Sequence, residues 1–272
     1  MIYWNGCSFV QGMEIERVQD QFAWIVSNHF GQDMLRHSKV GGSNDRIFRN
    51  MIDDFMHPQG ITANDQVWGK EAADPVKIVA ARPKMVIIVW SNINRFEYLN
   101  RANNTWRQAA WTRHRMAMDD FTVSDDSEMH YHPDMNRPQW EGVNNYGRSV
   151  RNAPSNLIET LNYMLAVKNM LELQKVPYLF YNMSDGQIKP VWRTLNEQKK
   201  EGANITWKQQ TLNGKHYKEL LPHMKEEAFY DMCIRKKVPF GPRDHPLHEG
   251  NRLMADRIIK DIYDKKMDKV FN

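Results

Sequence analysis

The sequence predicts a three-layer α/β/α fold, in which helices cover both faces of a mostly parallel sheet. Two observations carry this prediction. Short apolar segments alternate with longer amphipathic segments along the 272-residue chain, as in repeated strand–helix–strand units. Residues 86–89 are four consecutive β-branched residues, a pattern typical of a parallel strand buried on both faces.

Strands are expected where apolar runs end in turn residues, and helices where apolar residues recur every three or four positions. The expected strands are residues 2–4, a weak pair at 33–35 and 39–40, residues 86–89 and residues 176–181. The expected helices are residues 21–30, 45–55, 156–174 and 250–267. Because the two kinds of element alternate, we expect right-handed crossovers between parallel strands.

Two stretches interrupt this alternation. Residues from about 100 to 153 are polar and aromatic, and those from about 185 to 240 are rich in Lys, Gln and Asn. We interpret both as insertions into a single domain of residues 1–272, and we expect them to form walls of a substrate site. The tryptophans of the first insertion, Trp106, Trp111 and Trp140, either stack on sugar rings or pack within the insertion.

The composition argues against several classes of protein. A net charge of +4, spread along the chain, is too small to predict a nucleic-acid partner. Two cysteines, Cys7 and Cys233, indicate a reducing compartment rather than a disulfide framework. The first residues do not form a secretory signal, and the longest apolar run, residues 85–90, is too short to cross a bilayer. We therefore expect a cytoplasmic protein with no membrane partner.

Distinctive residues follow three of the expected strands and precede the last helix. Ser8 follows the first strand, Gly42 the second and Asn92 the third, while His245 stands just before the final helix. In open α/β sheets, catalytic groups gather at the carboxyl ends of the strands. There His245 can deprotonate Ser8, and three donors can stabilise an oxyanion: the Ser8 N–H, the Gly42 N–H and the Asn92 amide.

This arrangement resembles the SGNH, or GDSL-type, hydrolase family, whose four blocks place Ser, Gly, Asn and His at successive strand ends. The matching residues are Ser8, Gly42, Asn92 and His245, the last with a proline after it and Gly250 five positions on. Cys7 and Trp90 stand where the family has aspartate and glycine, and we expect the Cys7 thiol to be a small buried hydrophobe. The resemblance spans residues 2 to about 262. It implies a flavodoxin-like sheet and a serine esterase that needs no cofactor.

The family usually carries an aspartate two or three residues before the histidine, but these positions are Arg243 and Pro242 here. Asp244 directly precedes His245 and is our candidate for orienting the imidazole. Two alternatives stay open. Ser8 and His245 act as a dyad, or Asp185, beyond the strand at 176–181, supplies the carboxylate.

The remaining polar candidates each have two interpretations. Arg95 can bind a polar substrate or simply pair with Glu97, and we take it as a substrate-binding residue. Asn94 lies two residues after Asn92 and is an alternative candidate for the asparagine that donates to the oxyanion. His130 and His132 lack an evident third ligand, so we expect no metal.

The sequence therefore predicts hydrolysis of a carboxylic ester through an acyl-enzyme on Ser8. The expected substrate is a small-molecule or glycan ester with a short acyl group, such as acetyl on a carbohydrate or another polar carrier. The alternative is a catalytically silent SGNH-like protein with a binding or structural role, of phage origin and associated with a virion. The missing aspartate favours that alternative. The sequence leaves the oligomeric state open.

Overall fold

The central sheet contains four parallel strands in the order β2-β1-β5-β9. They are β1 (Ile2–Gly6), β2 (Met34–Ser38), β5 (Met85–Trp90) and β9 (Tyr178–Asn182). The structure is a computed structural model that describes residues 1–39, 41–56, 61–63, 77–79, 82–93, 95–100, 105–112, 128–129, 153–184, 204–207, 210–213, 218–224 and 227–271. The sheet confirms the predicted α/β fold, and its strand order is the flavodoxin-like one.

The helices and the smaller strands complete the described chain. The helices are α1 (Ser8–Gln11), α2 (Phe22–His29), α3 (Asn44–Met56), α5 (Ala153–Leu173), α8 (Leu221–Met224), α9 (Phe229–Arg235) and α10 (His248–Asp264), with 3-10 turns η1 (Val18–Asp20), η2 (Lys218–Leu220) and η3 (Asp268–Phe271). The smaller strands are β3 (Ile61–Ala63), β4 (Lys77–Val79), β6 (Arg95–Asn100), β7 (Thr105–Thr112), β8 (Glu128–Met129), β10 (Asn204–Trp207) and β11 (Gln210–Asn213). All of these pair in antiparallel hairpins or ribbons.

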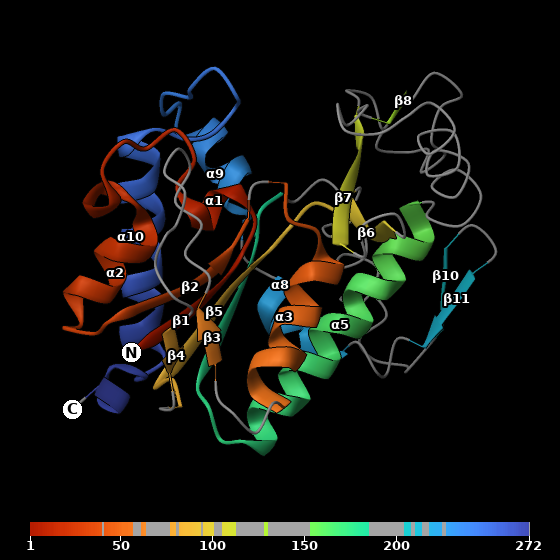
Figure 1. The fold of residues 1–272 in the computed structure, drawn as a ribbon, viewed down its shortest axis with the longest axis horizontal. Helices are drawn as coiled ribbons and strands as arrows, with labels where there is room; N and C mark the ends of the chain where they lie inside the picture. Colours follow the sequence, from red (N-terminus) through yellow and green to blue (C-terminus); the bar gives the residue numbers. More distant parts are fainter. Residues whose placement is uncertain are drawn as a thin grey trace.

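Helices cover both faces of the parallel sheet (Figure 1). On one face lie α2 and α10, and on the other lie α3 and α5. Side chains alternate along β5: Val86 and Ile88 pack with α3 and α5, whereas Ile87 and Val89 pack toward α2 and α10. Every residue of β5 is therefore buried, which explains its uninterrupted apolar sequence.

The second strand differs from its prediction. The sequence predicts one weak strand made of residues 33–35 and 39–40, whereas β2 runs without a break through residues 36–38, which are buried. Tertiary partners account for this: Arg36 Nη1 donates to the Gln11 carbonyl at 3.0 Å, and His37 Nδ1 lies 2.7 Å from Asp54 Oδ2. Buried polar groups are tolerated when they are paired, and a sequence pattern does not reveal the pairing.

The end of the second expected insertion also belongs to the core. Leu220 is fully buried with the side chains of α3 and α5, and Phe229, the first residue of α9, is fully buried with those of α2 and α10. Two residues of the stretch 185–240 thus contribute to the core, while its interpretation as an insertion stays a prediction. Most of its remaining residues, like most of 100–153, lie outside the described ranges.

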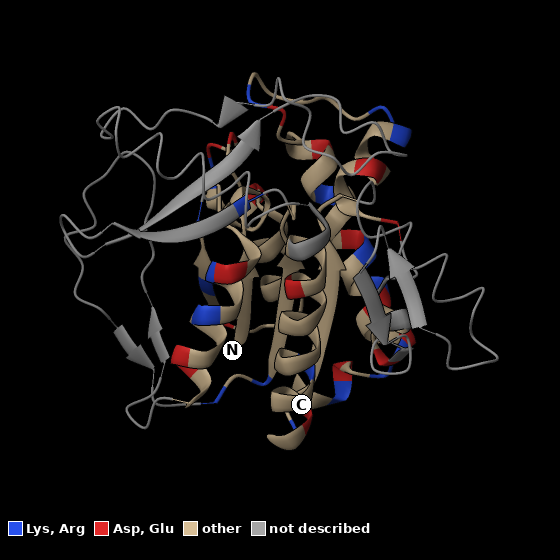
Figure 2. Cartoon of the chain, turned by 90° about the vertical axis from the view of Figure 1, so that its right-hand side faces the viewer, with Lys and Arg blue, Asp and Glu red and all other residues tan. Residues whose placement is uncertain are grey.

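Charged residues of both signs are interspersed on the helices in Figure 2. On α10 they pair one turn apart, with Arg252 Nε 3.0 Å from Asp256 Oδ1 and Arg257 Nε 3.1 Å from Asp261 Oδ2. Such pairs contribute about 0.3–0.5 kcal/mol each. In the part of the chain that the structure describes, no helix has the length and apolar character of a membrane span.

A buried asparagine joins two of the loops at the carboxyl edge of the sheet. Asn44, the first residue of α3, accepts the Ser91 N–H at 2.7 Å and donates to the Ser91 carbonyl at 3.1 Å. The same amide donates to Thr160 Oγ1 on α5 at 3.0 Å. Asn44 therefore ties the loop after β2 to the loop after β5.

We predict that Asn44→Ala lowers the free energy of unfolding by about 1–3 kcal/mol, because the Ser91 N–H is left buried without a partner. Urea denaturation followed by circular dichroism measures the change. The exposed Asn28→Ala is the matched control and should stay within about 0.5 kcal/mol of the wild type. Equal stability of the two variants would contradict the role of Asn44.

Candidate functional site

Ser8 lies at the carboxyl end of the central strand β1, where the chain turns directly into α1. The turn requires glycine at position 6, since a Cβ there would lie 2.5 Å from Val10 Cγ2 and 2.9 Å from the Val89 carbonyl oxygen. Ser8 is the first residue of α1, so its N–H has no acceptor within that helix. Its side chain is almost fully buried, with 1% of the residue exposed.

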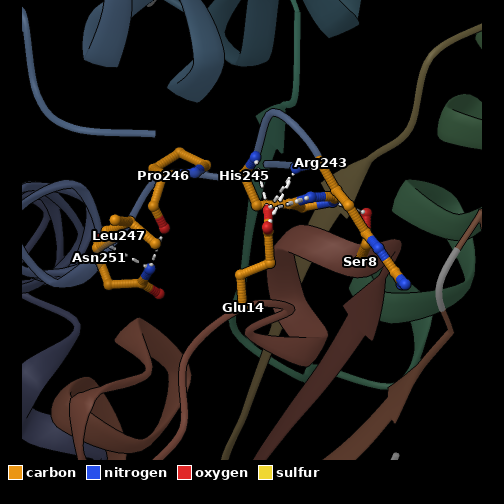
Figure 3. A network of polar contacts seen from close by, with 7 residues as sticks. All are labelled: Ser8, Glu14, Arg243, His245, Pro246, Leu247 and Asn251. Carbon is orange, nitrogen blue, oxygen red and sulfur yellow. Dashed lines mark hydrogen bonds and ion pairs between the residues drawn. The ribbon is translucent and has the colours of Figure 1, made fainter. Parts of the chain in front are cut away.

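The structure brings His245 to Ser8, from the other end of the chain. His245 Nε2 lies 2.7 Å from Ser8 Oγ, a hydrogen-bonding distance (Figure 3). The histidine stands in a tight loop between α9 and α10, closed by the hydrogen bond from the Gly241 N–H to the His245 carbonyl at 2.9 Å. Phe9 packs against the imidazole, with ring centroids 5.5 Å apart. The two residues that the sequence paired for proton transfer are therefore neighbours.

The glycine five residues after the histidine has a steric role. A Cβ at Gly250 would lie 2.4 Å from Pro246 Cβ and 3.3 Å from Cys233 Sγ. Gly250 thus allows the first turn of α10 to pack against the proline that follows His245. This close packing is the physical reason for the spacing between histidine and glycine seen in the sequence.

Glu14 is the carboxylate that faces the other side of the imidazole, and sequence reasoning missed it. Its Oε2 lies 3.3 Å from His245 Nδ1, off the line of a good ring N–H hydrogen bond. The same carboxylate accepts the His245 backbone N–H at 3.2 Å and the Arg243 N–H at 3.0 Å. A loop glutamate six residues after the serine has no periodic or motif signal, so tertiary structure alone reveals this contact.

The role of Asp244 in orienting His245 stays a prediction. Asp244 is exposed and has a left-handed backbone, with φ of 57°, whereas the carboxylate beside Nδ1 is that of Glu14. The alternative acid, Asp185, lies outside the described residues.

The surroundings of His245 lower the pKa of its imidazole below the ordinary value of 6.5. Burial is the largest cause, because it disfavours the charged ring. The Glu14 carboxylate and the Arg243 backbone oppose burial, whereas the Arg95 guanidinium adds to the lowering. The net direction keeps the imidazole neutral, the form that can accept a proton.

The predicted oxyanion residues lie at the same edge, but the geometry does not favour all of them equally. Gly42 packs against the chain entering Ser8, since a Cβ there would lie 3.4 Å from Cys7 Cα. Its N–H donates to the Lys39 carbonyl at 2.9 Å, and its role as an oxyanion donor stays a prediction. Asn92 is half-buried in the loop after β5, and its carbonyl accepts the Arg95 N–H at 3.2 Å.

Arg95, the predicted substrate-binding residue, reaches the site from the start of β6. It is half-buried, and its Nη1 donates to Ser91 Oγ at 3.2 Å. The positive charge of its guanidinium is the smallest of the influences that lower the pKa of the His245 imidazole. The Glu97 side chain and Asn94, the two neighbours weighed with it, are outside what the structure describes.

The cysteine before the serine is a core residue. Cys7 is fully buried, and its Sγ lies 3.5 Å from Met183 Sδ, as expected of a small apolar side chain. Among the described residues, no three or more His, Cys, Asp or Glu side chains group as metal ligands do. His130 and His132 fall outside those residues.

Two solved structures resemble the fold. One is a carbohydrate esterase whose active site displays divergent catalytic and non-catalytic binding functions, with TM-score 0.43 and 14% identity over 100% of this chain and 66% of that one. The other is an acetyl xylan esterase from the rumen bacterium Butyrivibrio proteoclasticus, with TM-score 0.46 and 11% identity over 97% and 63%. The chain thus spans slightly less than two thirds of either length. No protein-family model and no curated protein matches it.

We predict that Gly250→Ala destabilises the fold. Overpacking typically costs about 1–3 kcal/mol, and here the added Cβ meets the rigid ring of Pro246, so this cost should outweigh the roughly 1 kcal/mol that alanine gains in a helix. Urea denaturation measures the difference. Glu249→Ala, an exposed neighbour on the same helix turn, is the control. A Gly250→Ala variant as stable as the wild type would refute the steric role.

Proposed function

We propose that the protein is a serine hydrolase that cleaves a carboxylic ester through an acyl-enzyme on Ser8. The observation that supports this most directly is the 2.7 Å separation of Ser8 Oγ and His245 Nε2 at the carboxyl edge of the sheet. A serine hydroxyl is a weak nucleophile until a base takes its proton. A neutral, half-buried imidazole at hydrogen-bonding distance is such a base.

In the first step, Ser8 Oγ attacks the ester carbonyl and its proton passes to His245 Nε2. The carbonyl electrons move to oxygen, and the resulting oxyanion needs donors positioned in advance. We assign the Ser8 N–H and the Asn92 amide to this role, because both belong to loops that leave adjacent strands at one edge. The Gly42 backbone supports the turn beneath Ser8.

In the second half of the reaction, the tetrahedral intermediate collapses and the alcohol leaves with the proton from His245. Water then attacks the acyl group on Ser8, again losing a proton to His245, and the carboxylic acid is released. The same imidazole thus acts as base and acid in turn.

The proposed substrate carries a short acyl group, such as acetyl, on a carbohydrate or another polar carrier. The small exposed fraction of Ser8 supports a short acyl group, because little space surrounds the hydroxyl. The nearby Arg95 supports a polar carrier, since a guanidinium binds oxygen-rich groups well.

We predict that Ser8→Ala abolishes labelling by a fluorophosphonate probe and lowers hydrolysis of p-nitrophenyl acetate by at least about 10³-fold. Peptide mapping by mass spectrometry should place the label on Ser8. Ser184 is another serine just beyond a strand of the same sheet, so Ser184→Ala is the matched control. This variant should still be labelled on Ser8. A wild type that takes up no label and hydrolyses no short ester would favour the catalytically silent alternative.

The activity should also depend on pH in a defined direction. His245 must be neutral to accept the serine proton, and burial lowers the pKa of its imidazole from 6.5. The acid limb of kcat/KM should therefore have its midpoint below pH 6.5, with loss of activity as the pH falls through it. Steady-state kinetics across pH measures the midpoint. A midpoint above 6.5 would show that another group, or an imidazole in a different environment, controls the reaction.

A further inference from the structure

We propose that Glu14 is the positioning residue of the site and holds His245 as the Nδ1–H tautomer with Nε2 directed at Ser8. This inference rests on the proposed function and identifies the acid that the family pattern leaves missing. Glu14 differs from the aspartate of the family in its place in the sequence. Its carboxylate comes from the loop after the serine rather than from the segment before the histidine.

The first support is the number of contacts that converge on one carboxylate (Figure 3). Glu14 accepts the Arg243 N–H at 3.0 and 3.2 Å through its two oxygens, and the His245 N–H at 3.2 Å. Between these two donors, Asp244 has a φ of 57°. The N–H groups on the two sides of a left-handed residue can point to one anion, while the Asp244 N–H between them donates to the Gly241 carbonyl at 3.1 Å. The histidine loop is therefore folded around the charge of Glu14.

The second support is steric fit on both sides of the carboxylate. A Cβ at Gly241 would lie 2.5 Å from Glu14 Oε1, so a side chain there would push the carboxylate out of its present place. Glu14 itself has a φ of 68°, an uncommon conformation that costs a non-glycine residue roughly 1–2 kcal/mol. Strained backbone persists where its surroundings over-determine it, and here it turns the side chain back toward the histidine loop.

The third support is the chemistry of the imidazole. A carboxylate beside Nδ1 favours a proton on that nitrogen, which leaves the Nε2 lone pair free to accept the Ser8 proton. It also stabilises the imidazolium formed during the reaction. Two other groups modify this effect: the Arg95 guanidinium opposes the positive charge on the ring, and the Arg243 backbone favours it.

The decisive variant is Glu14→Gln, which keeps the shape of the side chain and removes its charge. The amide oxygen can still accept the backbone N–H groups, but an amide NH₂ facing Nδ1 favours the wrong tautomer. We expect the titration midpoint of His245, followed by NMR of the resting protein, to fall below that of the wild type. Loss of the charge that opposes burial is the reason. A His245→Asn variant assigns the resonance.

Two matched variants test whether the shift in the His245 midpoint is specific to Glu14. Glu16→Gln removes an exposed charge from the same loop and should leave the midpoint unchanged. Asp244→Asn tests the acid adjacent to the histidine, and should also leave it unchanged. A shift in Asp244→Asn without a shift in Glu14→Gln would overturn the proposal and restore Asp244.

A purely structural role predicts a different result. If Glu14 only held the loop in place through its backbone contacts, Glu14→Gln would keep those contacts and leave the midpoint unchanged; a loop that came loose would raise the midpoint toward the ordinary value near 6.5. A rise, or no shift, overturns the proposal. In the proposed role, the rate of Ser8 labelling at pH 8 should fall about tenfold or more in Glu14→Gln, and Glu14→Asp should recover part of it.

A measurement on the wild type tests the proposal even if the Glu14→Gln variant does not fold. The ¹⁵N chemical shifts of the His245 ring report which nitrogen is protonated in the neutral form. We expect Nδ1–H, and an Nε2–H tautomer would overturn the proposal. Both NMR measurements need no turnover. A protein without esterase activity but with the expected tautomer and midpoint shift would therefore count against the proposed function and not against the role of Glu14.

Discussion

The central strand β1 is the constraint on which the rest of the structure depends. It is hydrogen-bonded to β2 on one side and β5 on the other, and every residue in it is buried. A strand in this position cannot move without breaking two ladders and two layers of core packing. The residue two positions beyond its end, Ser8, is therefore held at a defined point of the carboxyl edge. That rigidity suits the role proposed for Ser8, because the reactivity of a nucleophile depends on placement within a fraction of an ångström.

Around this fixed point, the edge is assembled from segments that are distant in the chain. Asn44 joins the loops after β2 and β5 through the backbone of Ser91, and Arg36 anchors the end of α1 from β2. The histidine loop closes over Ser8 because Glu14 satisfies its N–H groups. Each connection is a polar contact in which one partner is a backbone group. Side-chain contacts with backbone groups thus help to determine where the loops lie, together with apolar loop residues such as Ile93 and Met183 that pack in the core.

Much of the fold could be predicted because its signals are local. The uninterrupted apolar run of β5 reflects burial on both faces, and the helical spacing in α3, α5 and α10 reflects burial of one face. Both patterns are visible in a single sequence. The strand β2 was harder, since Arg36 and His37 look exposed until their partners are known. The placement of Ser8 at one edge with the loops after β2 and β5 also followed from order along the chain, because parallel strands bring their carboxyl ends together, whereas His245 lies in a loop between two helices.

What the sequence alone determined is the layered α/β fold and the identity of the serine and histidine that meet at its edge. The tertiary structure decided what faces the second imidazole nitrogen, where Glu14 and not Asp244 lies, and it decided that the Gly42 N–H is already bonded to Lys39. The physical reason is the range of the interactions. Burial patterns and strand order are encoded in local periodicity. The partner of a single polar atom depends on loop conformations, including the left-handed turns at Glu14 and Asp244, that no periodic pattern records.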